Sequence, residues 1–361
     1  MDYEALDKQY LWHPFTQMRD WMDSPQLVIE RGQGVYLFDT EGNRYLDGVS
    51  SLWASIHGHR HPALVRAIRQ QLARLEHSTF LGLTNVPAVE LAKKLVAIAP
   101  PNLTRVFYSD NGSTAVEIAL KMSFQFWRQR GKEFARKQKF ISFANAYHGD
   151  TLGSVSLGGV DLFHKIFKPL LFKSFKVFYP DCYRCPFGKQ PDSCDVYCLK
   201  EFEATLKKHH REVCAVVVEP AVQGAAGMLT APRGFLKRIE TLCRAHHVHL
   251  ILDEVATGFG RTGQMFACEQ EQVTPDFLAL AKGLSGGTLP LAATLTTREV
   301  FEAFLGEYSE FKSFFHGHTY TGNPLACAAA AANLDLFKSE KTLQKLPPKI
   351  AFLNQRLADF W

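Results

Sequence analysis

The chain has 361 residues, of which 46% are hydrophobic and 21% are charged, a composition close to the globular average. It excludes a disordered, collagen-like or coiled-coil chain, and the sequence contains no run of about 18 apolar residues that would predict a membrane-spanning helix. The formal charge of +5, from 41 basic and 36 acidic side chains, is too small an excess to indicate nucleic-acid binding. The length predicts two or three domains, or one large α/β domain with an attachment.

The N-terminus and the cysteine content predict a cytoplasmic protein. Residues 1–5 (MDYEA) lack the basic start followed by an apolar stretch that is typical of a secretory signal. Eight cysteines in 361 residues are too few for a disulfide scaffold, so we expect reduced thiols.

The first 60 residues differ in pattern from the rest of the chain. Short apolar segments at residues 27–30, 35–39 and 45–48 are separated by glycines, Gly42 among them. Short runs broken by turn residues in this way predict a small antiparallel meander.

From residue 105 onward, short apolar segments alternate with helical ones. The expected strands are 105–109, 140–143, 215–219, 248–253, 277–281 and 292–296, and the expected helices are 113–130, 199–210, 233–247, 324–338 and 349–361. This alternation predicts an α/β fold with a mostly parallel central sheet and helices on both faces.

Four cysteines lie in a segment rich in Pro, Asp and Gly, residues 179–198, which we expect to be a surface excursion. Cys182, Cys185, Cys194 and Cys198 have the spacing C-x2-C-x8-C-x3-C. Four thiolates can hold zinc or an iron–sulfur cluster. Free surface thiols are the alternative, and the chemistry predicted below requires no metal.

A candidate phosphate site follows the strand at 105–109. Residues 110–114 (DNGST) open a long helix with Gly112 and Ser113. Free backbone N–H groups and the positive end of the helix dipole favour an anion at such a position. An ordinary helix cap explains the same residues.

Three further strand ends carry reactive or aromatic side chains. Asp253 ends an apolar strand, where its partner is Arg261, a helix end, a metal or a protonated ring nitrogen. Lys282 ends another strand, and a desolvated lysine there is a candidate Schiff-base nucleophile. Tyr147 follows the strand at 140–143 and can stack on a planar ring. A surface lysine and a packed tyrosine are the simpler interpretations.

Taken together, these features match the requirements of a pyridoxal 5′-phosphate site. The cofactor needs an anchored phosphate, a lysine for its aldehyde, an acid for its ring nitrogen and an aromatic cover. The sequence resembles the class III aminotransferases of fold type I, through DEVATGFGRTG (253–263) and LALAKGLSGG (278–287). Within that class it is similar to the aminotransferases of biotin biosynthesis, through LWHPFTQM (11–18), DGVSSLWASIHGH (47–59), EHSTFLGLTNVPAVELAKKL (76–95) and FFHGHTYTGNPLACA (314–328).

The resemblance implies roles for individual residues. Lys282 is the expected Schiff-base lysine and proton carrier, Asp253 the partner of the pyridine nitrogen, and Tyr147 the ring cover that also touches substrate. Gly112 and Ser113 are expected to bind the phosphate, and His318 and Thr319 to complete that site from the neighbouring subunit of a homodimer. The expected substrate pocket contains Phe15, Leu52, Trp53 and Gly317. Asp150, Glu219, Gln223 and Arg261 match family positions near the site.

The implied reaction is the ping-pong transamination of 8-amino-7-oxononanoate to 7,8-diaminononanoate, with S-adenosylmethionine or lysine as the amine donor. The alternatives are another class III ω-aminotransferase, acting on a diamine or an ω-amino acid, and a cofactor-binding chain without turnover. Phe15 and Leu52 stand where many members carry Tyr and Trp, which affects the donor pocket.

The resemblance also divides the chain. Residues 1–60 are the expected N-terminal part of a small domain, 61–320 the large cofactor-binding domain, and 321–361 the start of a C-terminal small domain that is otherwise largely missing.

Overall fold

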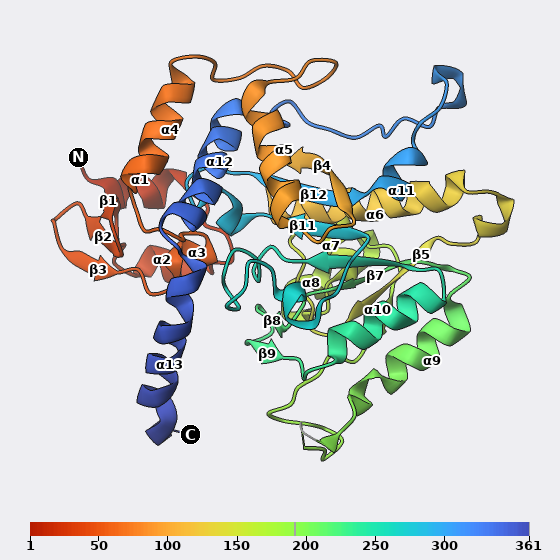
Figure 1. Cartoon of the computed structure of the whole chain (residues 1–361). Coiled ribbons are helices and arrows are strands. Elements are labelled where there is room, and N and C mark those ends of the chain that lie inside the picture. Colours follow the sequence, from red (N-terminus) through yellow and green to blue (C-terminus); the bar gives the residue numbers. More distant parts are fainter. Residues whose placement is uncertain (191–192, 361) are drawn as a thin grey trace.

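The computed structural model describes residues 1–190 and 193–360. The chain is built around a seven-stranded sheet with the strand order β4-β12-β11-β10-β7-β5-β6 (Figure 1). Its strands are β4 (Leu103–Ser109), β5 (Lys139–Phe143), β6 (Phe175–Val177), β7 (Val213–Val218), β10 (His249–Asp253), β11 (Phe277–Leu280) and β12 (Ala292–Thr297).

Most neighbours in this sheet are parallel. β10 runs parallel to β7 and β11, and β5 runs parallel to β7 and β6. β12 is antiparallel to both of its neighbours, β11 and β4. The mostly parallel sheet is therefore confirmed, and the carboxyl ends of its parallel strands meet along one edge.

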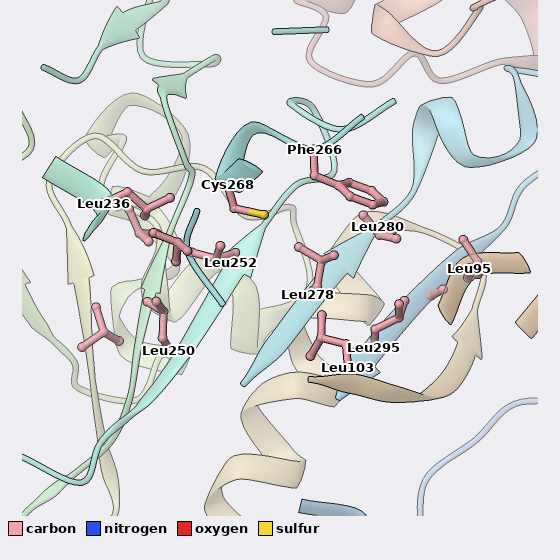
Figure 2. Packing of buried hydrophobic residues seen from close by; sticks show 14 of the residues in the cluster. Leu95, Leu103, Leu236, Leu250, Leu252, Phe266, Cys268, Leu278, Leu280 and Leu295 are labelled. Carbon is pink, nitrogen blue, oxygen red and sulfur yellow. The ribbon is translucent and has the colours of Figure 1, made fainter. Parts of the chain in front are cut away.

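Helices cover both faces because the strands are apolar on both sides. In β10, Leu250 and Leu252 belong to one buried cluster and Ile251 to another on the opposite face. Figure 2 shows the first cluster, where Leu252 lies beside Leu278 of the neighbouring strand β11. The helices that contribute to it are α5 (Val86–Ile98), α9 (Lys200–His209), α10 (Phe235–Ala245) and α12 (Pro324–Ser339), and those of the opposite cluster are α6 (Gly112–Gln129), α7 (Leu152–Leu157) and α11 (Arg298–Glu302).

Asparagine caps explain where the long helices begin. The side chains of Asn85, Asn111 and Asn323 accept hydrogen bonds from the third residue of α5, α6 and α12, respectively. Such a bond satisfies a donor that the helix leaves unpaired. The predicted helices at 113–130 and 324–338 agree with α6 and α12 within one residue at each end.

Some elements differ from the sequence prediction. The expected helix at 349–361 begins earlier, as α13 (Leu346–Leu357), and continues as a 3₁₀ turn at Ala358–Phe360. β6 was not predicted because it has three residues, one of them a lysine, and therefore gives little pattern to recognise. The sequence also gave no prediction for α4 (Pro62–Leu72), which packs against α12 (Figure 1).

The N-terminal meander is present as a separate sheet. It consists of β1 (Ile29–Gln33), β2 (Tyr36–Asp39) and β3 (Arg44–Leu46), paired antiparallel in that order. The short helices α1 (Tyr3–Tyr10) and α2 (Met18–Asp23) precede this sheet. The domain boundaries at residues 60 and 320 stay a prediction. Within the described residues, no helix combines the length and the apolar character that crossing a membrane requires.

Candidate active site

A cavity of about 510 Å³ lies where the chain leaves β5, β10 and β11 and enters α6. Six of the eleven residues predicted to bind the cofactor or the substrate line it, and they come from positions up to 229 residues apart along the chain. They are Trp53, Gly112, Ser113, Tyr147, Asp253 and Lys282. The fold thus brings the three strand ends and the start of α6 to one place.

The start of α6 is shaped by close contacts of small residues. A Cβ atom at Gly112 would lie 2.6 Å from Val255 Cγ1, so only glycine fits there without displacing Val255. The Ser113 hydroxyl lies 2.7 Å from Thr151 Oγ1 and accepts a hydrogen bond from the Thr151 amide at 3.1 Å. This packing leaves the N-terminal turn of α6 facing the cavity, where its unpaired N–H groups favour an anion.

Asp253 has a buried histidine partner. His148 Nδ1 lies 2.7 Å from Asp253 Oδ2, and both residues are buried. An ionised carboxylate only accepts hydrogen bonds, so His148 Nδ1 donates to it. His148 directly follows Tyr147, but no role was predicted for it from the sequence. The one sequence feature that could have pointed to His148 is its place beside an aromatic residue at a strand end. Only the fold shows that His148 faces the carboxylate of Asp253.

Tyr147 is fixed by polar contacts at both ends. Its hydroxyl donates to Asp150 Oδ2 at 2.6 Å, and its amide donates to Glu219 Oε1 at 3.2 Å. Burial and the nearby Asp150 raise the pKa of Tyr147, so the phenol stays protonated. The ring can therefore act as a neutral, oriented surface on the cavity wall.

Glu219 is a second buried carboxyl group on this wall. Burial raises its pKa to about 7, with a smaller contribution from Asp253 in the same direction. Its Oε2 accepts a hydrogen bond from the Gly224 amide at 3.2 Å. Of the family positions near the site, Glu219 and Asp150 line the cavity.

Lys282 and Trp53 face each other across the cavity. Lys282 Nζ lies 4.5 Å from the centre of the Trp53 ring. Burial lowers the pKa of Lys282, and the nearby Asp253 and Glu219 partly oppose that shift. Lys282 itself has a φ of +45°, a left-handed conformation that is uncommon for a residue other than glycine.

The segment that carries Trp53 is also left-handed. Ser50, Ser51, Leu52 and Trp53 all have φ between +47° and +66°. Each such residue costs about 1–2 kcal/mol relative to a right-handed conformation. Strained segments of this kind cluster at functional sites, and here the segment carries the ring that covers Lys282.

Five of the selected residues do not line this cavity in the described part of the chain. Phe15 and Leu52 are 68% and 67% exposed, although Phe15 packs edge-on against Phe163, which in turn contacts Tyr147. The others lie in the segment before α12 and are Gly317, His318 and Thr319. His318 Nδ1 is 3.4 Å from the carboxylate of Asp110, two residues before α6.

Two further family positions lie beside the cavity without lining it. Gln223 donates to the carbonyl oxygen of Ala144 at 3.1 Å. Arg261 donates to the carbonyl oxygen of Ser55 at 3.4 Å, next to the left-handed segment.

Comparison with known proteins identifies the family. The sequence model of the family described as "Aminotransferase class-III" matches residues 18–360 of this chain. The chain belongs to the class-III aminotransferase family.

Individual relatives agree with this assignment. The aminotransferase is 59% identical, over 98% of its length, to an "Adenosylmethionine-8-amino-7-oxononanoate aminotransferase" from Nitratidesulfovibrio vulgaris, and it covers 65% of that protein. It is 56% identical, over 97% of its length, to the protein of the same name from Geobacter sulfurreducens, and it covers 77% of it. The crystal structure of the Methanocaldococcus jannaschii protein of that name superposes with a TM-score of 0.92 at 47% identity, covering 98% of this chain and 78% of that one.

Pyridoxal phosphate is the cofactor of this family, and the residues of the cavity fit it. The start of α6 offers N–H groups for a phosphate, Lys282 an amine for an aldehyde, and the buried Asp253 a carboxylate for a ring nitrogen. His148 Nε2 is buried without a hydrogen-bond partner among the described residues. His148 lines the cavity, so this ring nitrogen can hydrogen-bond to a bound group.

The four loop cysteines lie close together, away from this site. Cys182, Cys185, Cys194 and Cys198 all line one small cavity of about 20 Å³. Among the residues that the structure describes, no group of three or more ligating side chains is arranged to hold a metal ion. The choice between a zinc or iron–sulfur site and free thiols stays a prediction.

Proposed function

We propose that this aminotransferase converts 8-amino-7-oxononanoate to 7,8-diaminononanoate, the amino-transfer step of biotin biosynthesis. The observation that carries the proposal is the meeting of Lys282, Asp253 and the start of α6 in one cavity. It occurs in a chain that is 59% and 56% identical to two relatives named for this keto acid.

The amine donor is proposed to be S-adenosylmethionine, with lysine as the alternative. The relatives' name, adenosylmethionine-8-amino-7-oxononanoate aminotransferase, supports the first donor. Phe15 and Leu52 are exposed on the N-terminal side of the site, where a donor can reach them. Phe15 contacts Phe163, and Phe163 contacts Tyr147, which connects this surface with the cavity wall.

Residues on three elements would hold the cofactor. Gly112 and Ser113 would bind its phosphate through the start of α6. Asp253, held by His148, would keep the proton on the pyridine nitrogen, because a buried carboxylate favours a cation beside it. Tyr147 would cover one face of the ring. When bound, pyridoxal phosphate supplies an electron sink for the bonds that break at the substrate carbon.

Lys282 would act at both ends of the reaction. Its Nζ would hold the cofactor at the aldehyde, and the same amine would move the proton from the substrate carbon. Burial favours the neutral amine that both roles need, because it lowers the pKa of Lys282. Trp53 limits the directions that Nζ can take, since its ring centre is 4.5 Å away.

We further propose a cytoplasmic homodimer. His318 and Thr319 lie outside the cavity of their own chain, so they would complete the phosphate site of a second copy. The buried cysteines are free thiols, which suits a reducing compartment; they are Cys214, Cys243, Cys268 and Cys327.

The visible absorption spectrum of the cofactor-loaded protein tests the proposal. S-adenosylmethionine and lysine are added in separate experiments, followed by 8-amino-7-oxononanoate. The absorption band of the bound cofactor should change to that of pyridoxamine phosphate with one donor, and the keto acid should restore it. A restored band would establish the acceptor, and the effective donor would be identified directly.

Two results would contradict the proposal. A band that responds to a diamine or an ω-amino acid and not to either proposed donor would favour a different ω-aminotransferase; a Thermomicrobium roseum ω-transaminase superposes with a TM-score of 0.92 at 33% identity. A stable band that responds to no amine would indicate a chain that binds the cofactor without turnover.

A further inference from the structure

A second cavity, of about 350 Å³, lies beside the catalytic one and shares none of its lining residues within the described chain. It is formed by β6, α7, the short helix α8 (Asp161–His164) and the 3₁₀ segment Lys165–Leu170. Apart from Asp161, its polar lining comes from three lysines, a histidine and two serines. These residues are Lys168, Lys173, Lys176, His164, Ser156 and Ser174.

Lys176 brings a cation into this cavity without a carboxylate partner. Its Nζ donates to Ser142 Oγ and to the Ser156 carbonyl oxygen, both at 3.0 Å. Both acceptors are neutral, and an ammonium group has three donors. None of the ion pairs found in the described residues includes Lys176 or Lys173. Burial lowers the pKa of Lys176 to about 7, so an anion bound beside its amine would favour the protonated form. Part of the side chain is exposed to solvent, so a ligand can reach it.

His164 adds buried and unused hydrogen-bonding capacity. The residue is 5% exposed, and both of its ring nitrogens are buried without a partner in the described structure. Burial lowers the pKa of His164, which favours the neutral ring with one N–H donor. Gly158 allows the ring to pack closely, because a Cβ atom there would lie 2.4 Å from His164 Cε1.

The charge of the cavity is positive. Asp161 is its one acidic lining residue, and its carboxylate lies 3.3 Å from Lys168 Nζ, with both side chains mostly exposed. Lys173 and Lys176 form no ion pair with a carboxylate of the described residues. Cations that converge on a concave surface favour a ligand of opposite charge.

We propose that this cavity is a binding site for a phosphate-class oxyanion, held by Lys176 and Lys173 and by the unpartnered ring of His164. Several N–H donors around one cavity suit the several acceptor oxygens of phosphate. The volume exceeds that of a single phosphate ion, so either free phosphate or the phosphate group of a larger monoester fits. The His164 ring stacks parallel to Tyr147, with centres 6.3 Å apart and planes at 9°, so the site adjoins the wall of the catalytic cavity.

The test measures phosphate binding by calorimetry in protein fully loaded with pyridoxal phosphate, because the cofactor then occupies the start of α6. Inorganic phosphate and phenyl phosphate are titrated separately, with sodium chloride at equal ionic strength as the blank. We expect about one site per chain, and Lys176→Met should weaken binding at least about tenfold. Tighter binding of phenyl phosphate would identify a monoester as the ligand, and equal binding would identify free phosphate.

Lys165→Met is the matched control. Lys165 is exposed on the same 3₁₀ segment as Lys168 but does not itself line the cavity, so its loss should change the affinity less than about twofold. Lys173→Met provides a second cavity variant and should weaken binding at least about threefold. The inference is wrong if neither anion binds to the loaded protein, or if both cavity variants bind as tightly as the control.

Discussion

The strand-end cavity and the N-terminal 60 residues are built by different means. All five residues of β10 are buried, and Asp253 lies at the end of that strand with His148 held against it. Within residues 1–60, all of which the structure describes, Asp39 alone is buried. Asp39 accepts hydrogen bonds from the Asn43 amide at 2.8 Å and from the Tyr45 hydroxyl at 2.8 Å.

This difference separates two parts of the proposed function. The groups proposed to perform the chemistry extend from a rigid apolar core, which fixes their positions. The residues proposed to recognise the donor, Phe15 and Leu52, belong to a polar and exposed region. Substitutions in the first region should therefore change catalysis or stability, and those in the second should change mainly donor affinity.

Removal of Lys282 should have the largest effect. Lys282→Ala deletes the amine proposed to bond to the cofactor and to move the proton, so kcat should fall by at least about 10³-fold. The cofactor's absorption band should also change, because its aldehyde loses its partner. Lys93→Ala, at an exposed position on α5, should leave both unchanged. Normal turnover in Lys282→Ala would contradict the assignment.

Asp253→Asn should have the second-largest effect. The amide cannot balance a proton on the pyridine nitrogen, so kcat should fall by about 10²- to 10⁴-fold. The melting temperature should change little, since Asn can still pair with His148. Steady-state kinetics with matched cofactor loading measures the effect. Asp20→Asn, at an exposed N-terminal position, serves as the control and should retain full activity.

Gly112→Ala tests the close packing at the start of α6, where the cofactor phosphate is proposed to bind. The new Cβ would lie 2.6 Å from Val255 Cγ1, so α6 or Val255 must shift at a cost of about 1–3 kcal/mol. We expect lower stability in urea unfolding and weaker cofactor binding. Gly48→Ala is the matched control, because no atom lies within 4 Å of a Cβ built there. Equal stability of the two variants would show that the contact at Gly112 relaxes freely.

Glu219 should make stability depend on pH. Burial raises its pKa from 4.5 to about 7, so the folded protein binds this proton more tightly than the unfolded chain. Its contribution to stability is present below about pH 4.5 and is lost as the pH rises toward about 7. In cofactor-free protein, the unfolding free energy of wild type relative to Glu219→Gln should fall across that range by about 1–3 kcal/mol.

Exposed Glu90→Gln provides the control for this titration. Its unfolding free energy should follow that of wild type at every pH. A Glu219→Gln variant that does the same would show that Glu219 does not carry the pH dependence.

Phe15→Tyr should have the smallest effect and concerns the second region. The added hydroxyl lies on an exposed ring, so the KM for the amine donor should change by about 3–10-fold while kcat and stability stay nearly constant. Phe352→Tyr, at an exposed position on α13, is the control. A large loss of kcat in Phe15→Tyr would contradict the division between the two regions.

Local patterns predicted much of the fold. The apolar runs at 248–253 and 277–281 match β10 and β11 within one residue at each end, because buried parallel strands need continuous apolar sequence. The family prediction and the pyridoxal phosphate prediction are confirmed. The roles of individual site residues stay predictions, although six of the selected residues line one cavity.

Pairings between distant residues could not be predicted in this way. His148 and Asp253 are 105 residues apart and meet only because β5 and β10 end at the same edge of the sheet. The same is true of Trp53 and Lys282, which also depend on the left-handed segment at residues 50–53. No local propensity favours four consecutive left-handed residues, so tertiary contacts must stabilise them.

The sequence by itself determined the α/β class, the order of the reactive residues and the family, because periodicity and local motifs express these directly. Only the tertiary structure decided which buried groups face one another, and it also revealed the cationic cavity beside Tyr147. The physical reason is that burial and electrostatic coupling depend on distance in space. The number of residues between two positions in the sequence does not give that distance, because the packing of the core decides which strand ends meet.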